Sequence, residues 1–284
     1  SESATLNVLG FERVGDLDPG EVVLVDAGGN LHRKVVAGRG KRQHRPCVFE
    51  FVYFARPDSV LDDISVYKSR LRLGEALAAG VQKRGIVPDI VVPVPDSARP
   101  AALECARVLG VRYREGLLKN RYVGRTFIMP GQTNRAKNVK AKLTTLPMEL
   151  DGKDVLLVDD SVVRGNTSRR IVEMVREAGA KKVYFGVTSP PLVAPCPYGV
   201  DMASKREFIA TDKSNEQIAT SLGVDYLQYL DRESMNEAAR AGNPKIERFC
   251  NACFTGEYPT PEVTLERLKV IEAERETRRD NVPV

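Results

Sequence analysis

The sequence lacks the features that would place it in a membrane or in an oxidising compartment. No apolar run approaches the length of a membrane span, and no charged-then-apolar leader is visible, so we expect a cytoplasmic protein without a membrane partner. Five cysteines in 284 residues argue against the disulfide framework of a small secreted domain. Histidine is also scarce: His32 and His44 lie outside any motif, and we therefore expect no histidine base in catalysis.

The composition is that of a globular protein with a sizeable core. Hydrophobic residues make up 42% and charged residues 29% of the chain, which is enough for one large or two modest domains. A net charge of +5 could indicate a nucleic-acid partner. The basic excess is scattered along the chain, however, so we expect no nucleic acid to be bound.

The stretch VLLVDDSVVRGNTSRR, residues 155–170, carries the strongest signal. Residues 155–158 form a short apolar run typical of a strand that is buried on both faces of a parallel sheet. Asp159 and Asp160 follow at the carboxyl end of that strand, where open α/β sheets place their ligands. Residues 161–168 supply a glycine, hydroxyls and backbone N–H groups at the start of a predicted helix, which favours a bound phosphate.

A substrate that combines ribose with phosphate explains this order of residues. In 5-phosphoribosyl 1-diphosphate (PRPP), two carboxylates can hold the ring hydroxyls directly or through Mg²⁺, and the loop can hold the 5-phosphate. The plainer alternative is a solvated strand end followed by a glycine turn. The ordered combination of strand, carboxylates, loop and helix favours the substrate site. It is not a Walker A loop, because no Gly-Lys-Ser/Thr follows.

Strands and helices alternate along most of the chain, which predicts an α/β fold with a parallel sheet flanked by helices. A hairpin is expected at residues 22–36, with its turn at 27–29. Further strands are expected at 48–54, 86–94, 111–113, 155–158, 182–188 and near 208–209. Helices are expected at 66–79, 101–109, 168–178 and 214–222. The segment 119–142 reads as a long loop.

The motif at 155–168 resembles the phosphate loop of the type I phosphoribosyltransferases. Four further segments narrow the resemblance to the amidophosphoribosyltransferase family, and they are PCVFEFVYFARPDS (46–59), VVPVPDSARPAAL (91–103), KNRYVGRTFIMPGQ (119–132) and CNACFTGEYPT (250–260). This resemblance implies displacement of pyrophosphate from PRPP by ammonia, which gives 5-phosphoribosylamine in the first committed step of de novo purine synthesis. The family loop usually has Thr where this chain has Asn166.

The resemblance also implies roles for individual residues. The PRPP-binding residues would be Pro95, Asp96, Ser97, Asp159, Asp160, Ser161, Arg164, Gly165, Asn166, Thr167 and Ser168. Mg²⁺ would be held by Ser97, Asp159 and Asp160. Lys119, Tyr122 and Arg125 would act catalytically from a cationic lid at 119–142, with Ile128 beside an ammonia path. Residue pattern alone leaves a solvated loop as an equal alternative for this segment.

Four of the five cysteines match the ligands of a 4Fe–4S cluster found in one branch of the family: Cys47, Cys196, Cys250 and Cys253. The C-x-x-C pair at 250–253 is only moderately specific, because zinc and redox sites share it. Zinc or free buried thiols are therefore the alternatives. Cys105 lies on an apolar helical face, where we expect a small core residue.

The resemblance divides the chain into three parts. Residues 1–46 would be the remnant of an N-terminal glutaminase domain, 47–262 the phosphoribosyltransferase domain, and 263–284 a charged C-terminal helix or tail. The family further implies ammonia from glutamine, purine nucleotide inhibitors and a homotetramer. A PRPP-binding regulator or a salvage phosphoribosyltransferase is the alternative, although no helix-turn-helix module is visible and a salvage enzyme would not need the four cysteines.

Overall fold

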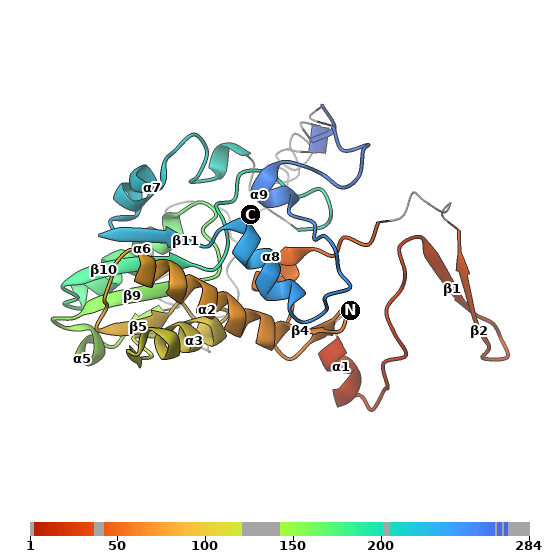
Figure 1. Ribbon diagram of the computed structural model, residues 1–284, viewed down its shortest axis with the longest axis horizontal. Helices are drawn as coiled ribbons and strands as arrows, with labels where there is room; N and C mark the ends of the chain where they lie inside the picture. Colours follow the sequence, from red (N-terminus) through yellow and green to blue (C-terminus); the bar gives the residue numbers. More distant parts are fainter. Residues whose placement is uncertain are drawn as a thin grey trace, which may run out of the picture.

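A parallel five-stranded sheet forms the core of the main body of the protein, at the left in Figure 1. The computed structural model describes residues 3–36, 43–120, 143–200, 205–264, 266–268 and 270–271. In this part of the chain the strands lie in the order β11 (Tyr226–Tyr229), β10 (Lys182–Val187), β9 (Asp154–Asp159), β5 (Ile90–Pro93) and β6 (Arg112–Tyr113). All four neighbouring pairs are parallel, as the alternating pattern predicted.

The central strand β9 is covered on both faces, which explains its uninterrupted apolar run. Leu156 and Val158 pack with helices α2 (Val66–Lys83) and α3 (Arg99–Leu109) on one face. Val155 and Leu157 pack with α6 (Asn166–Glu177) and α7 (Asn215–Leu222) on the other. Successive side chains of a strand point to opposite faces, so one strand anchors both helical layers.

Helices α2 and α3 lie in direct backbone contact. A Cβ atom added at Gly74 would stand 2.0 Å from the carbonyl oxygen of Ala101. No side chain fits there, so the glycine is what allows the two helices to approach this closely. The contact fixes α2 against α3, the helix that follows the loop at 95–98.

Shorter elements complete the described chain. They are α1 (Ser3–Val8), β1 (Glu21–Val25), β2 (Leu31–Val35), η1 (Glu50–Phe54), β3 (Val60–Leu61), β4 (Ile64–Ser65), β7 (Leu117–Lys119), β8 (Leu143–Thr145), α5 (Pro147–Leu150), η2 (Lys205–Glu207), α8 (Arg232–Arg240) and α9 (Ala252–Thr255). Strands β7 and β8 are antiparallel, and Lys119 lies opposite Leu143. The segment between them therefore starts and ends at one place on the sheet domain.

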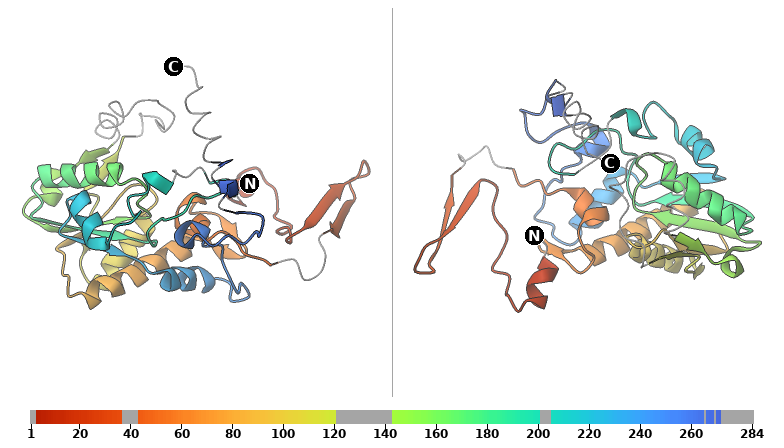
Figure 2. Two further views of the ribbon diagram at one scale, coloured as in Figure 1. Left: turned by 90° about the horizontal axis from the view of Figure 1, so that it is seen from above. Right: turned by 180° about the vertical axis from the view of Figure 1, so that it is seen from behind.

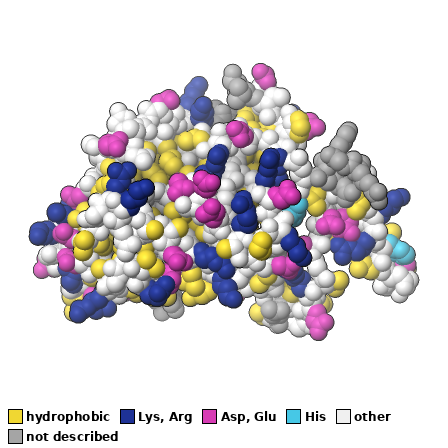
Figure 3. Space-filling view, viewed as in Figure 1, with side chains coloured by type: hydrophobic (Ala, Val, Ile, Leu, Met, Phe, Trp, Pro, Cys, Tyr) yellow, Lys and Arg dark blue, Asp and Glu magenta, His cyan; other side chains and the backbone are white. Residues whose placement is uncertain are grey.

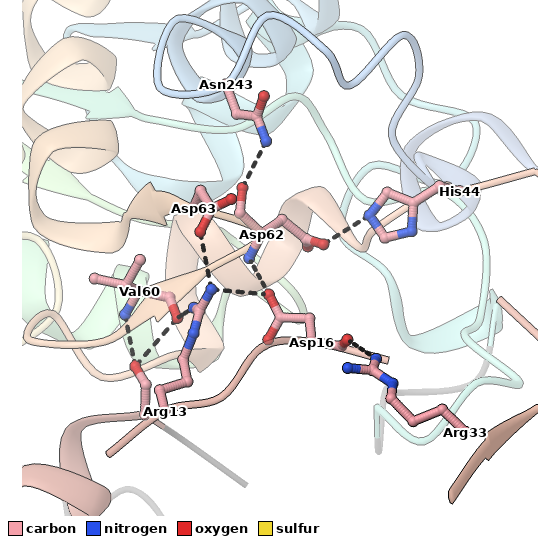
Figure 4. Close-up of polar contacts among 9 residues, drawn as sticks. Arg13, Asp16, Arg33, His44, Val60, Asp62, Asp63 and Asn243 are labelled. Carbon is pink, nitrogen blue, oxygen red and sulfur yellow. Dashed lines mark hydrogen bonds and ion pairs between the residues drawn. The ribbon is translucent and has the colours of Figure 1, made fainter. Parts of the chain in front are cut away.

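The N-terminal hairpin of β1 and β2 stands away from the sheet (Figure 2). Its turn lies where the sequence predicted it, and Leu24 and Val25 are more than half exposed. Ionic contacts connect the preceding segment to the body at the β3–β4 turn, where Arg13 reaches Asp63 at 2.8 Å (Figure 4). The hairpin's own His32 contacts Asp26 at 2.8 Å.

The turn between β3 and β4 gathers three segments of the chain (Figure 4). The backbone N–H of Asp62 donates to Asp16 at 3.2 Å, and the side chain of Asp62 contacts His44 at 2.6 Å. Asn243, beyond α8, donates to the carbonyl oxygen of Asp62 at 2.9 Å. The N-terminal segment, the stretch before Cys47 and the loop after α8 thus meet on one two-residue turn.

Two predicted strands are wrong. Residues 48–54 are helical, with η1 at their carboxyl-terminal end. Their alternation was misleading because Val48, Phe49, Phe51 and Val52 are all buried in one core cluster. Phe208 and Ile209 follow the short helix η2 instead of forming a strand, and the fifth strand of the sheet is β11.

Charges of both signs are interspersed over the face shown in Figure 3, with no separate basic surface on it. This arrangement agrees with the scattered charge of the sequence. Within the described ranges, no helix has the length and apolar character needed to cross a bilayer.

Candidate functional site

The candidate site lies at the carboxyl ends of β5 and β9, in the middle of the sheet. From β5 the chain first adds β6 on one side and later adds β9 on the other. The strand order therefore reverses between β5 and β9, and ligands of open α/β sheets bind at such a reversal. The loops that leave these two strands contain residues 94–98 and 160–165.

Asp159 and Asp160 lie where the sequence placed them, and hydroxyl groups hold the second carboxylate. Asp160 is 5% exposed. Ser97 donates to its Oδ2 at 2.5 Å, and Ser161 donates to its Oδ1 at 2.6 Å. The backbone N–H of Asp160 donates to Oδ1 of Asp159 at 2.9 Å. Ser97 comes from the β5 loop, so the structure brings the two predicted loops into direct contact.

The carboxylate pair concentrates negative charge in a poorly solvated place. Burial raises the pKa of both groups, and the charge of Asp160 raises that of Asp159 further. The hydroxyls of Ser161 and Ser97 and the charge of Arg70 lower the pKa of Asp160, but burial outweighs them. Such a pair is stabilised by a cation or by hydroxyl donors, which are what a sugar with Mg²⁺ offers.

The phosphate loop ends on a glycine that no other residue replaces easily. Gly165 precedes α6 with φ +76°, in the left-handed region, and carries no capping side chain. The first N–H groups of a helix have no acceptor within the helix, so those of Asn166, Thr167 and Ser168 are placed for an anion at the positive end of α6. Arg164 reaches Glu207 at 2.7 Å.

The β5 loop carries the residues expected to hold pyrophosphate. The peptide bond between Pro95 and Asp96 is cis. Lys119, at the end of β7, donates to Oδ2 of Asp96 at 2.7 Å. Arg99, in the first turn of α3, contacts Glu115 at 3.2 Å. The predicted lid residue Lys119 therefore stands beside the predicted pyrophosphate loop.

Residues 121–142 of the predicted lid lie outside the described part of the chain. This range includes the candidate residues Tyr122, Arg125 and Ile128. Their roles in catalysis and in an ammonia path stay predictions.

The four cysteines predicted as a set come together from three distant segments. Cys47 and Cys250 form an isolated parallel bridge, and the N–H of Cys250 donates to the carbonyl oxygen of Pro46 at 2.8 Å. The carbonyl oxygen of Cys253 accepts from the N–H of Ala194, near Cys196, at 3.1 Å. These backbone contacts tie residues 46–48, 193–196 and 250–253 to one another.

Cys196 and Cys253 are buried, Cys47 and Cys250 are partly buried, and the four act on one another electrostatically. Burial raises the pKa of Cys47 to about 12, and it also raises that of Cys250 and Cys253. The charges of Cys47, Cys196 and Cys250 raise the pKa of Cys253 further. In the described ranges, His, Cys, Asp and Glu form no group of three or more that could hold a metal ion. Cys105 is buried on α3 away from this set, as predicted for a core residue.

Two hollows of the described surface lie apart from the carboxylates. One, of about 500 Å³, lies between α6 and α7, where Arg176 donates to the carbonyl oxygen of Gly223. The other, of about 520 Å³, lies beside Cys47 and is bordered by Glu50 and Asp62.

Three residues around the site belong to none of the sequence motifs and were not predicted. Arg70, buried on α2, donates to the carbonyl oxygens of Phe51, Tyr53 and Ala55, and its charge reaches Asp160. Glu207 and Ile209 contact the phosphate loop. A single arginine inside a helical pattern and a short apolar pair carry no recognisable signal in a sequence.

Comparisons with known proteins agree with this geometry. A family model described as a phosphoribosyl transferase domain matches residues 62–223. The amidophosphoribosyltransferase of Pseudomonas aeruginosa is 48% identical over 277 residues, which are 97% of this chain and 55% of that protein. The amidophosphoribosyltransferase of Escherichia coli is 45% identical over 265 residues, or 93% of this chain and 52% of that protein. The chain thus spans about half the length of these curated relatives.

A solved structure is similar over nearly the whole chain. It is the glutamine phosphoribosylpyrophosphate amidotransferase of Bacillus subtilis complexed with ADP and GMP, with a TM-score of 0.81 and 38% identity. The match covers 94% of this chain and 58% of that one. The sheet order, the loops at the carboxyl ends of β5 and β9, and these matches together show a type I phosphoribosyltransferase fold. The chain belongs to the phosphoribosyltransferase family, and over nearly its whole length it is similar to the amidophosphoribosyltransferases.

Proposed function

We propose that this chain binds PRPP and transfers its phosphoribosyl group to ammonia, giving 5-phosphoribosylamine and pyrophosphate. The observation that carries the proposal is the contact of Ser97 with Asp160 directly beside the phosphate loop, because it joins the two loops that one PRPP molecule would occupy. The relatives named amidophosphoribosyltransferase support the choice of ammonia as the acceptor. In that family the reaction is the first committed step of purine synthesis.

The reaction needs orientation and charge more than a side-chain nucleophile. The nitrogen lone pair of ammonia attacks C1 of the ribose while the bond from C1 to the pyrophosphate oxygen breaks, with inversion at C1. The pyrophosphate leaves with the bonding electrons, and the new ammonium group loses a proton to solvent. Asp159 and Asp160 would hold the ribose hydroxyls, and residues 161–168 would hold the 5-phosphate through Ser161, Arg164, Gly165, Asn166, Thr167 and Ser168.

Mg²⁺ fits the oxygen atoms at the meeting point of the two loops. Ser97, Asp159 and Asp160 offer hydroxyl and carboxylate oxygens, which are the donors this ion prefers. Burial raises the pKa of both carboxyl groups, and a nearby cation would offset that effect, which supports this placement of the ion. When bound, the ion would supply charge stabilisation for the leaving pyrophosphate.

A cationic lid would complete the pyrophosphate site. Lys119 already lies 2.7 Å from Asp96, and Pro95 and Asp96 would line the same site. We propose Lys119, Tyr122 and Arg125 as the lid's catalytic residues. Their charges and hydroxyl would face the leaving group, and closure would exclude water from the reactive C1 centre.

We further propose that Cys47, Cys196, Cys250 and Cys253 hold a 4Fe–4S cluster with a structural role. Thiolates are the ligands that such a cluster takes, and these four cysteines would supply them. The backbone contacts between their segments and the charge effects of the other three on Cys253 support the grouping of these cysteines. Protons of the buried thiols would be released as the cluster binds. Zinc is the alternative occupant.

The remaining proposals concern partners. We propose that ammonia comes from glutamine through a glutaminase domain and that residues 1–46 belong with that domain. Residues 47–262 would form the phosphoribosyltransferase domain, and residues 263–284 a charged helix or tail. The exposed apolar side chains of the hairpin support a further covering surface there. A homotetramer, inhibition by purine nucleotides and a cytoplasmic location follow from the family resemblance.

The test is pyrophosphate release from PRPP with Mg²⁺ and ammonia at raised pH. We expect turnover with ammonia and none when a free purine or pyrimidine base replaces it. Asp159→Asn should lower the rate strongly, and Arg176→Gln, at the hollow between α6 and α7, should leave it within about twofold. Turnover with a free base would instead favour a salvage enzyme. Tight binding of PRPP without turnover would favour a regulator.

A further inference from the structure

Ile209 lies against the phosphate loop although no motif includes it. The chain passes from η2 at Lys205–Glu207 directly over the loop that joins β9 to α6. Ile209 is 5% exposed and belongs to the core cluster on the α6 face of the sheet. Its position is therefore set by the core and not by solvent.

Backbone and side chain of this segment contact three consecutive residues of the loop. The N–H of Ile209 donates to the carbonyl oxygen of Val163 at 2.9 Å. Glu207 contacts Arg164 at 2.7 Å. A Cβ atom added at Gly165 would stand 2.3 Å from Cδ1 of Ile209. One short segment thus holds residues 163, 164 and 165 by a hydrogen bond, an ion pair and a packing contact.

These contacts lie at the part of the loop whose backbone conformation determines the direction of the first N–H groups of α6. Gly165 is the residue before α6, and its left-handed conformation aims the first N–H groups of the helix at the anion position. A loop that contains a glycine has alternative backbone conformations, and fixing it before binding removes an entropy cost from the binding step. The core-anchored side chain of Ile209 blocks the space into which Gly165 would otherwise move.

We propose that Ile209 is a positioning residue for the 5-phosphate of the substrate, acting through Val163 and Gly165. The inference rests on the proposed PRPP site, and it adds the residue that holds the phosphate loop of that site in its binding conformation. Ile209 touches no reacting atom. Its effect is confined to the half of the site that receives the 5-phosphate, because its contacts lie on the β9 loop and not on the β5 loop at 95–97.

Two partial ligands separate this role from general stability. Ribose 5-phosphate occupies the phosphate loop, and Mg²⁺-pyrophosphate occupies the β5 loop. Calorimetry on the full chain would measure both affinities for the wild type, Ile209→Ala, Ile209→Val and the matched control Ile218→Ala. Ile218 is buried in the same core cluster, on α7. All measurements are made about 15 °C or more below the lowest melting temperature of the four, so that each variant is folded.

We expect Ile209→Ala to weaken ribose 5-phosphate binding about tenfold or more, which corresponds to about 1.4 kcal/mol. Mg²⁺-pyrophosphate binding should change less than about twofold, and Ile218→Ala should leave both affinities within about twofold. Ile209→Val, which removes only the atom nearest Gly165, should give an intermediate loss. It also serves as the test if the alanine variant does not fold.

The outcomes separate this inference from the proposed function. A wild-type chain that binds neither partial ligand would defeat the PRPP site itself. A wild type that binds both, with Ile209→Ala and Ile209→Val unchanged toward ribose 5-phosphate, would overturn only the role of Ile209. Equal losses for both ligands, or for Ile218→Ala, would show a general effect on the core and would likewise overturn it.

Discussion

Replacing Asp160 by Asn should separate stability from activity. Asp160 is buried between two hydroxyl donors, Ser97 and Ser161. Asn has the same shape, keeps one acceptor oxygen and turns the other position into a donor. A serine hydroxyl can rotate to accept from that amide, so both contacts survive in neutral form. We therefore expect a folded variant with a damaged substrate site.

The structure allows the size of each effect to be worked out. Hydrogen bonds to a charged group contribute about 1.5–3 kcal/mol and neutral ones about 0.5–1.5 kcal/mol, so two exchanged bonds cost about 2–3 kcal/mol. Removing one buried charge next to Asp159 returns several kcal/mol. The free energy of unfolding should thus stay equal or rise. Loss of one preorganised charge contact should lower the rate about 10²–10³-fold, or about 3–4 kcal/mol.

The pH dependence of stability checks the same reasoning. Burial raises the pKa of Asp160 above its ordinary value of 3.8, so the folded state binds this proton more tightly than the unfolded state. Its contribution to stability is present at low pH and is lost as the pH rises through the raised folded pKa. In Mg²⁺-free buffer, the stability of Asp160→Asn relative to the wild type should therefore increase from pH 4 toward neutrality.

Denaturant unfolding from pH 4 to 8 and pyrophosphate release with PRPP and ammonia are the two measurements. Two results would refute the reasoning. One is a rate within about tenfold of the wild type. The other is a clearly less stable variant at neutral pH, which would mean that the carboxylate is held by favourable contacts stronger than its burial cost.

Three further changes test other parts of the structure. Gly165→Ala should cost about 1–3 kcal/mol and weaken ribose 5-phosphate binding, because the new Cβ meets Ile209 at a left-handed φ; unchanged melting and affinity would contradict this. Arg70→Gln should lower the melting temperature by about 6–12 °C through loss of about 3 kcal/mol of carbonyl contacts, whereas Arg72→Gln, with one contact at 3.4 Å, should change it far less. Cys250→Ser should lose the iron and sulfide of anaerobically purified protein while Cys105→Ser keeps them, and zinc in the wild type would point to the alternative site.

Much of the sheet domain could be predicted because its signals are local. The run at 155–158 is uninterrupted by charge, since both faces of β9 are covered. The helices at 66–79 and 168–178 show their apolar faces in the sequence, and the structure places α2 and α6 there. The candidate carboxylates follow from position alone, because the end of a buried parallel strand is where such sheets bind ligands.

The failures have tertiary causes. Residues 48–54 have the aromatic and β-branched composition of a strand, yet they form helical turns buried among Phe249, Phe254 and neighbouring residues. The guanidinium of Arg70 donates to the carbonyl groups at the end of η1. These carbonyl groups therefore have hydrogen-bond donors without a neighbouring strand. This helix therefore depends on a side chain 15 to 19 residues away, which no local pattern contains.

The candidate site was predicted unevenly for the same reason. Residues that carry chemistry, such as Ser97 and Asp160, stand in recognisable motifs. Residues that hold those motifs in place do not, because packing on a glycine has no preferred residue type. Ile209 reads as part of a short strand in the sequence, and only the folded chain shows it above the phosphate loop.

The β3–β4 turn combines a strained backbone with side chains that bind the N-terminal segment and the stretch before Cys47. Asp62 and Asp63 both have positive φ, at 49° and 59°, a conformation that costs a residue with a side chain about 1–2 kcal/mol. Asn and Gly would relieve that cost at these positions. They would also remove the carboxylates that reach His44 and Arg13. Relief of strain at this turn would therefore weaken its attachment to the N-terminal segment, which would keep its contacts with the backbone of Val60 and Asp62.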